Sequence, residues 1–153
     1  YKRQVVGHVD NSYWRDMGRP DDFVRGSSDL VRGIAHSPLL AGHTGESVVD
    51  ESAGIAGGVL LLSGTAVGRG SVIGAGSRLD GTVVFDGVTI EPGAIISNSI
   101  IASGAHIGAN AHIDNCVIGE GATIGARCEL QGGMRVFPGV NLPDAGVRFS
   151  SDA

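Results

Sequence analysis

An aliphatic residue recurs about every six positions from Val49 to Leu142. The steps between these residues are six positions long, except for steps of five after Leu79, Ile96 and Ile113. A period of six fits neither an α-helix nor a simple strand. It predicts coils of 17 or 18 residues with three short flat faces, each coil stacked on the next as parallel strands. The series is Val49, Ile55, Leu61, Val67, Ile73, Leu79, Val84, Ile90, Ile96, Ile101, Ile107, Ile113, Ile118, Ile124, Leu130, Val136 and Leu142.

A second inward-pointing column is expected four positions after the aliphatic residues, where the chain is mostly small or apolar. The turns between faces need positive φ, which explains why 26 of the 153 residues are glycine, against an average usage of roughly 7%. So much glycine excludes an ordinary helical bundle. The second column consists of Ser71, Ser77, Val83, Val88, Ala94, Ala105, Ala111, Val117, Ala122 and Cys128.

Charge and composition exclude several classes of protein. A net charge of -5 argues against a nucleic-acid binder. Two cysteines do not make a disulfide framework, and no apolar run approaches the roughly 20 residues that span a bilayer. No signal-peptide pattern is present at the start, so a cytoplasmic location is expected. Because the chain begins at Tyr1 rather than Met, we expect it to be a fragment of a longer protein.

The first part of the chain has a different composition and predicts other elements. Val5 to Val9 predicts a short strand. Pro20, followed by two acidic residues and apolar positions up to Ile34, predicts a helix that ends near Gly33.

The repeat Ile-Gly-Xaa-Gly-Ala/Ser-Xaa, which starts at Ile73 and again at Ile118, resembles the hexapeptide-repeat family. That resemblance implies a mainly β fold, a left-handed parallel β-helix. Acyltransferases of this family form trimers and use a histidine as general base, which makes His106 and His112 candidates for that role. On the residues alone, these histidines are better explained as solvated or interface side chains that point outward.

The segment from Trp14 to Phe23 resembles the Trp-x-Asp-x-Gly-Thr-Pro-x-x-Phe/Tyr motif of the sugar-nucleotide pyrophosphorylases, in particular the bacterial mannose-1-phosphate guanylyltransferases of the actinobacterial type. One departure is that Arg19 stands in place of the family's threonine. The resemblance implies that residues 1–34 are the α/β end of a Rossmann-like nucleotidyltransferase domain. Residues 35–48 would then be a linker, 49–147 the β-helix and 148–153 a C-terminal tail.

The resemblance also implies a chemistry, the attack of a sugar 1-phosphate on a nucleoside triphosphate with release of pyrophosphate. In that family Asp16 would be a ligand of Mg²⁺, and Trp14 and Gly18 would lie near the substrate. Asp16 would be the second of the family's two metal-binding aspartates. Its partner aspartate and the glycine-rich nucleotide loop would lie upstream, so this chain alone is expected to be inactive. Both substrates would be bound through that upstream domain, and the β-helix would serve oligomerisation or regulation in a homo-oligomer.

Alternatives remain open at this point. Taken without the family, Asp16 is explained as a cap of the helix that starts near Pro20, and Trp14 as a packing residue. Arg15 and Arg19 could face phosphates or be merely solvated. Instead of a nucleotidyltransferase, the chain could be a hexapeptide-repeat acyltransferase or a non-catalytic assembly module. Cys116 and Cys128 do not stack, which makes a shared metal site improbable, and Cys128 is expected to be buried.

Overall fold

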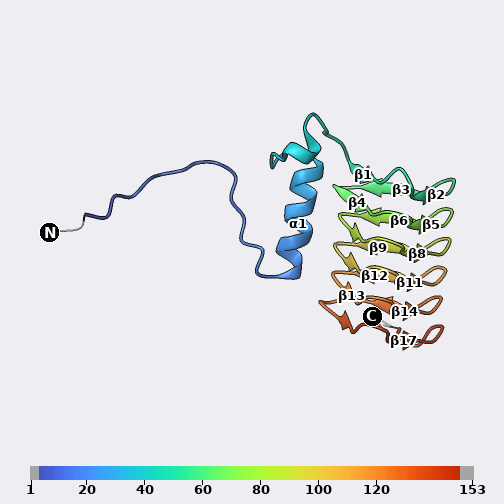
Figure 1. Ribbon diagram of the computed structural model, residues 1–153. Coiled ribbons are helices and arrows are strands. Elements are labelled where there is room, and N and C mark those ends of the chain that lie inside the picture. The colour runs from blue at the N-terminus through green and yellow to red at the C-terminus, as the bar shows by residue number, and fades with distance from the viewer. Residues whose placement is uncertain (1–3, 149–153) are drawn as a thin grey trace, which may run out of the picture.

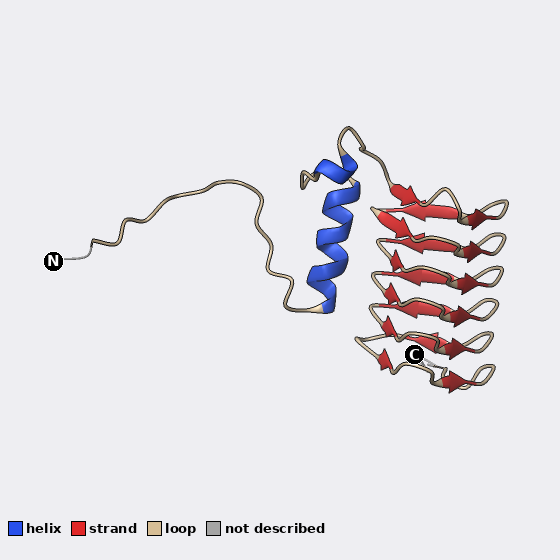
Figure 2. Cartoon of the chain, in the orientation of Figure 1, coloured by secondary structure: helices blue, strands red, loops and turns tan. Residues whose placement is uncertain are grey.

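The computed structural model describes residues 4–148 and shows a three-sided β-helix with one α-helix along its side (Figures 1 and 2). Tyr1 and most of the expected tail, residues 149–153, lie outside the described residues. The helices are α1 (Pro20–Val31) and the 3-10 helix η1 (Pro38–Leu40). The strands are β1 (Ser47–Val49), β2 (Gly54–Ile55), β3 (Leu60–Leu62), β4 (Thr65–Val67), β5 (Val72–Ile73), β6 (Arg78–Asp80), β7 (Val83–Val84), β8 (Thr89–Ile90), β9 (Ile95–Ser97), β10 (Ile100–Ile101), β11 (His106–Ile107), β12 (His112–Asp114), β13 (Val117–Ile118), β14 (Thr123–Ile124), β15 (Glu129–Leu130), β16 (Arg135–Val136) and β17 (Asn141–Leu142).

The strands form three parallel sheets, one for each side of the β-helix. Sheet A has the order β1-β4-β7-β10-β13-β16, sheet B the order β17-β14-β11-β8-β5-β2, and sheet C the order β15-β12-β9-β6-β3. Ser47 pairs with Thr65, 18 residues on, whereas Ile100 pairs with Val117, 17 residues on. These pairings confirm the predicted coil length, and the stacked parallel coils agree with the expected left-handed parallel β-helix.

The core is the predicted aliphatic column. From Ile73 to Leu130 its members are almost completely buried and form one continuous cluster with the small residues beside them. Val49 and Ile55, in the first coil, are exposed because no further coil within the described residues covers that end. Burial of this column supplies most of the fold's stability, since isolated strands of two or three residues are not stable.

At the corner between sheets C and A, the residues that point inward are not the ones expected from the sequence. The inward positions there are Thr65, Thr82, Ser99 and Cys116, all buried. Polar groups at this corner are satisfied between coils: the Thr65 hydroxyl accepts a hydrogen bond from the Thr82 amide at 3.2 Å, and the Ser99 hydroxyl accepts one from the Cys116 amide at 3.0 Å.

Val83 and Val117, which were expected to point inward, do not belong to the core cluster. This expectation was wrong for both residues. A corner that is one residue short shifts the inward position by one, so each valine lies on the outer side of the sheet, next to an inward-pointing residue.

Helix α1 confirms the predicted helix, with proline in its first turn and Gly33, at a φ of 74°, just past its end. Val24 and Val31, seven residues apart, are buried on one side of it. The helix lies against β4 of sheet A (Figure 1).

Three contacts fix α1 to the β-helix. The Ser28 hydroxyl donates to the carbonyl of Ser63 at 2.8 Å. A Cβ built on Gly64, whose φ is 77°, would lie 2.6 Å from the Cα of Ser28, so only glycine fits beneath the helix there. The ring of Phe23 stacks on that of Phe85, with centroids 6.4 Å apart.

The segment before α1 is extended and leads away from the β-helix (Figure 1). The strand predicted from Val5 to Val9 is wrong for this chain, because the structure assigns no regular element between residues 4 and 19. A strand needs a neighbour for its backbone hydrogen bonds, and none of the described residues supplies one. Val5 is 96% exposed. Within residues 4–148, no helix has the length and apolar character needed to cross a bilayer.

Candidate functional site

The three site residues predicted from the sequence lie together on the segment from Tyr13 to Gly18, just before α1. Trp14 is 82% exposed, and Asp16 and Gly18 are exposed as well. No turn or bend interrupts this segment. The Asp16 carboxylate forms no hydrogen bond or ion pair with any residue from 4 to 148. The structure therefore presents Trp14 and Asp16 to the surroundings.

Two side chains of this segment are bound to α1. The Tyr13 hydroxyl donates to the Asp29 carboxylate at 2.7 Å, and Arg15 Nη2 donates to the same carboxylate oxygen at 3.0 Å. Arg15 Nε also donates to the Tyr13 hydroxyl at 3.0 Å, which closes a three-residue network. The hydrogen bond to Tyr13, followed by that to Asp29, raises the pKa of the Arg15 guanidinium, so this group remains a cation.

Met17 contacts the same side of α1 as Tyr13 and Arg15. A Cβ built on Gly26 would overlap the end of the Met17 side chain, so the glycine leaves the space that this methionine fills. Gly26 and Asp29 are three residues apart and therefore share one face of the helix. That face differs from the one that Ser28 and Val24 turn toward the β-helix.

Gly18 has an ordinary backbone conformation and is absent from the positive-φ positions. A Cβ built on it would lie 3.5 Å from Asp16 Oδ1, an ordinary contact distance. The backbone conformation at this position therefore does not require glycine. What glycine does here is leave open space beside the Asp16 carboxylate.

The explanation of Asp16 as a helix cap is wrong. The residue at the N-cap of α1 is Arg19, and the helix has no side-chain cap. This leaves the Asp16 carboxylate without a structural role among the described residues.

A metal site is not complete within the described part of the chain. No group of three His, Cys, Asp or Glu side chains in residues 4–148 is placed to hold an ion. The Asp16 carboxylate is not part of such a group, and a hard cation prefers several oxygen ligands. These residues by themselves therefore do not fit a bound Mg²⁺.

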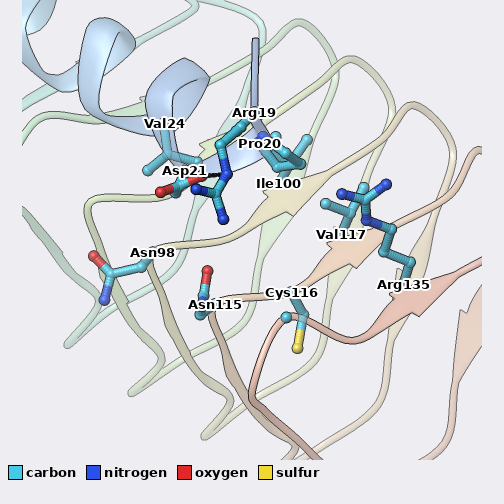
Figure 3. Close-up of a pocket in the computed structure, with 11 residues that line it drawn as sticks. Arg19, Pro20, Asp21, Val24, Asn98, Ile100, Asn115, Cys116, Val117 and Arg135 are labelled. Carbon is cyan, nitrogen blue, oxygen red and sulfur yellow. Dashed lines mark ion pairs between the residues drawn. The ribbon is translucent and has the colours of Figure 1, made fainter. Parts of the chain in front are cut away.

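A pocket of about 250 Å³ lies between the first turn of α1 and sheet A (Figure 3). Ile100 and Val117, on β10 and β13, form its apolar floor, and Arg135 of β16 lies at its edge. Arg19 points toward Asp21, 3.7 Å away. The positive charge of Arg19 and the negative charge of Asp21 therefore lie together at this end of the pocket. The role of Arg19 in facing a phosphate stays a prediction.

This pocket was not predicted from the sequence, although the sequence contains one signal for its rim. Asn98 and Asn115, which line it, have φ of 48° and 51°. Asparagine tolerates this left-handed conformation better than most residues, and each asparagine directly precedes the inward-pointing residue of the short corner, Ser99 or Cys116. These two asparagines therefore mark the position of the corner in the sequence.

The two candidate histidines do not form a common site. His106, on β11 in sheet B, lies with Nε2 3.1 Å from Glu91 Oε1. The second oxygen of Glu91 accepts a hydrogen bond from the Ala109 amide at 2.9 Å, so this carboxylate is held as part of the coil packing. His112 lies on β12 in sheet C and is exposed. Both histidines point outward, as expected, but from different sides of the β-helix.

Both cysteines are buried and free. Cys128 lies in the inward column, as predicted, and Cys116 belongs to the short-corner column, which was not predicted. The Cys116 thiol donates to the carbonyl of Asp114 at 3.1 Å. Burial raises the pKa of this thiol.

The family model of the GMPPB C-terminal domain matches residues 43–147, which is more than half of the chain. The chain belongs to the GMPPB C-terminal domain family. It is 62% identical over 149 residues to a mannose-1-phosphate guanylyltransferase of Mycobacterium tuberculosis. That match covers 97% of this chain and 42% of the relative, so the chain spans less than half of the relative's length, in its C-terminal part.

Solved structures show the same fold. A GDP-perosamine N-acetyltransferase from Caulobacter crescentus, in complex with CoA and GDP-perosamine, superposes with a TM-score of 0.58 at 23% identity, covering 71% of this chain and 55% of that one. The acetyltransferase domain of PglB from Neisseria gonorrhoeae, in complex with acetyl coenzyme A, superposes with a TM-score of 0.51 at 24% identity. The match covers 78% of this chain and 57% of that one. At this level of identity the likeness concerns the β-helix alone.

Proposed function

We propose that this chain is the C-terminal part of a mannose-1-phosphate guanylyltransferase, an enzyme that makes GDP-mannose from mannose 1-phosphate and GTP. The observation that carries this proposal is the 62% identity with the mycobacterial relative over 97% of the chain. The match includes the segment from Tyr13 to Gly18, where the structure exposes Trp14 and Asp16 together. The cytoplasmic location stays a prediction.

The proposed reaction sets the requirements for the whole enzyme. A phosphate oxygen of mannose 1-phosphate attacks the α-phosphorus of GTP, and the bond to pyrophosphate breaks. The reaction brings several negative charges together, so positioning and charge neutralisation dominate its catalysis. Mg²⁺ is the proposed cofactor, and when bound it would neutralise phosphate charge.

In this proposal the described residues contribute one part of the site. Asp16 supplies a single carboxylate ligand to a metal site that residues outside this chain would complete. Trp14 and Gly18 lie next to it on the exposed side and would contact the sugar-phosphate substrate. The open space beside Gly18 and the exposed ring of Trp14 are the features that support these roles.

The β-helix is proposed to serve oligomerisation or regulation. Within the described residues α1 covers part of sheet A, while the outer surfaces of sheets B and C carry no covering element (Figure 2). Flat, repetitive surfaces of this kind bury area efficiently in symmetric oligomers. A homo-oligomer is therefore the proposed assembly.

The test uses the natural polypeptide that contains this chain, purified and supplied with mannose 1-phosphate, Mg²⁺ and each nucleoside triphosphate in turn. We expect GDP-mannose and pyrophosphate to form fastest with GTP, and the 153-residue chain alone to form neither. Absence of sugar-nucleotide formation with every triphosphate would overturn the proposal. Acetyl transfer from acetyl coenzyme A in a parallel assay would then identify an acyltransferase, and oligomers without either activity an assembly module.

A further inference from the structure

Alternate side chains of the segment from Tyr13 to Gly18 have opposite environments. Tyr13, Arg15 and Met17 contact α1, through the Asp29 carboxylate and the space above Gly26. In an extended chain successive side chains point to opposite sides. Trp14 and Asp16, which lie between the anchored residues, consequently face away from the helix, in agreement with their exposure.

The anchoring is stronger at Asp29 than a typical surface ion pair. Its carboxylate receives hydrogen bonds from both a hydroxyl and a guanidinium, and the side chains of Arg15 and Asp29 are only 29% and 16% exposed. Partial burial and three mutual hydrogen bonds fix the geometry of such a network better than a single exposed pair does. Asp29 is itself held in place, because its carbonyl accepts the amides of Ile34 and Ala35 at the end of α1.

The same helix connects this network to the β-helix. Ser28, adjacent to Asp29, donates to Ser63 at the corner between sheets C and A, directly over Gly64. The exposed face of Trp14 and Asp16 is thus attached to the β-helix through one rigid element of 12 residues.

We infer that Tyr13, Arg15 and Asp29 are positioning residues, which hold the segment from Tyr13 to Gly18 against α1 so that Trp14 and Asp16 face the reacting substrates in one fixed orientation. The identity of those substrates rests on the function proposed above; the ordering of the segment does not. The consequence is that loss of the network frees the segment without unfolding the β-helix, whose core lies elsewhere.

The first test measures the order of the segment in this chain by 15N relaxation. We expect order parameters near 0.85 for the amides of Trp14 and Asp16, and below 0.6 for Val6, whose side chain is 86% exposed. Arg15→Leu should lower the values for Trp14 and Asp16 to those of Val6, and Arg15→Lys, which still reaches Asp29, should recover most of the order. Unchanged order in Arg15→Leu would overturn the inference.

The matched control is Arg127→Leu, which removes another arginine paired with an aspartate, Asp144, on the β-helix. It should leave the order of the segment and the thermal midpoint unchanged. The midpoint of Arg15→Leu should also remain within a few degrees of the wild type, which separates loss of order from loss of fold.

The second test uses the natural polypeptide. There we expect Arg15→Leu to lower kcat/KM about ten- to a hundredfold, because misplacement of a site by about 1 Å has effects of this size. Arg15→Lys should recover most of the loss. If the segment loses order and kcat/KM does not change, the positioning role is overturned. If the wild type has no guanylyltransferase activity, the proposed function fails, while the relaxation result still decides whether the network orders the segment.

Discussion

Phe23 of α1 lies parallel to Phe85, which directly follows β7, with an angle of 12° between the rings and 6.4 Å between their centroids. The two residues are 62 positions apart, yet their stacking joins the helix to the outer side of sheet A. Phe23 is 39% and Phe85 41% exposed, so each ring keeps one side in water. The contact shows that α1 is part of the same packed unit as the β-helix.

This stacking predicts a measurable coupling. Phe85→Ala should lower the free energy of unfolding by about 1–2 kcal/mol, less than the about 3–5 kcal/mol of a fully buried phenylalanine. A double-mutant cycle with Phe23→Ala, followed by chemical denaturation, should give a coupling of about 0.5–1.5 kcal/mol. Phe137→Ala is the control: that ring is 75% exposed, and its removal should change stability by no more than about 0.5 kcal/mol. A coupling of zero would show that the rings do not stack in solution.

The close approach of α1 to Gly64 predicts an unequal effect of two similar substitutions. Gly64 and Gly76 both have positive φ, 77° and 69°. Gly76→Ala has open space around its Cβ and should cost only the left-handed backbone penalty of about 1–2 kcal/mol. Gly64→Ala should cost about 1–3 kcal/mol more, because its Cβ would overlap Ser28. Equal losses in urea denaturation would contradict the packing of α1 at this corner.

The buried thiol of Cys116 predicts a pH dependence of stability. Its pKa is raised in the folded chain, so above the ordinary thiol value of about 8.5 the unfolded chain binds fewer protons than the folded one. Stability contributed by this group is therefore present below that pH and is lost as the pH rises above it. The free energy of unfolding, measured from pH 7 to 10.5, should fall less steeply with pH for Cys116→Ala than for the wild type. Identical slopes would show that the thiol is not a contributor.

Asp16 predicts a loss of activity without a loss of fold. In the natural polypeptide, Asp16→Asn should reduce turnover with Mg²⁺ by orders of magnitude, since the amide cannot replace an anionic ligand. Its thermal midpoint should not change, because the carboxylate has no partner within residues 4–148. Asp144→Asn serves as the control that removes an aspartate from the β-helix and should leave turnover nearly intact. Near-normal turnover of Asp16→Asn would remove Asp16 from the metal site.

The candidate site could be located from the sequence but not oriented. The motif placed Trp14, Asp16 and Gly18 next to one another, and the structure keeps them together. Whether they faced the helix or the surroundings depended on Gly26 and Asp29, which come eight or more positions later and have no recognisable signal in the sequence. The pocket beside Arg19 was missed for a similar reason, because its floor comes from Ile100 and Val117.

The aliphatic period alone determined the coil length, the three faces and the inward column from Ile73 to Leu130, because each of these follows from local spacing repeated along the chain. Other features depend on contacts between distant residues. The short corner turns Val83 outward and Cys116 inward, because a coil that loses one residue must realign against the coils above and below. Val5 to Val9 has the composition of a strand but remains unpaired here, since a strand exists only when a neighbour supplies its hydrogen bonds. The orientation of Asp16 likewise was decided by packing, through a network that only the folded helix brings together.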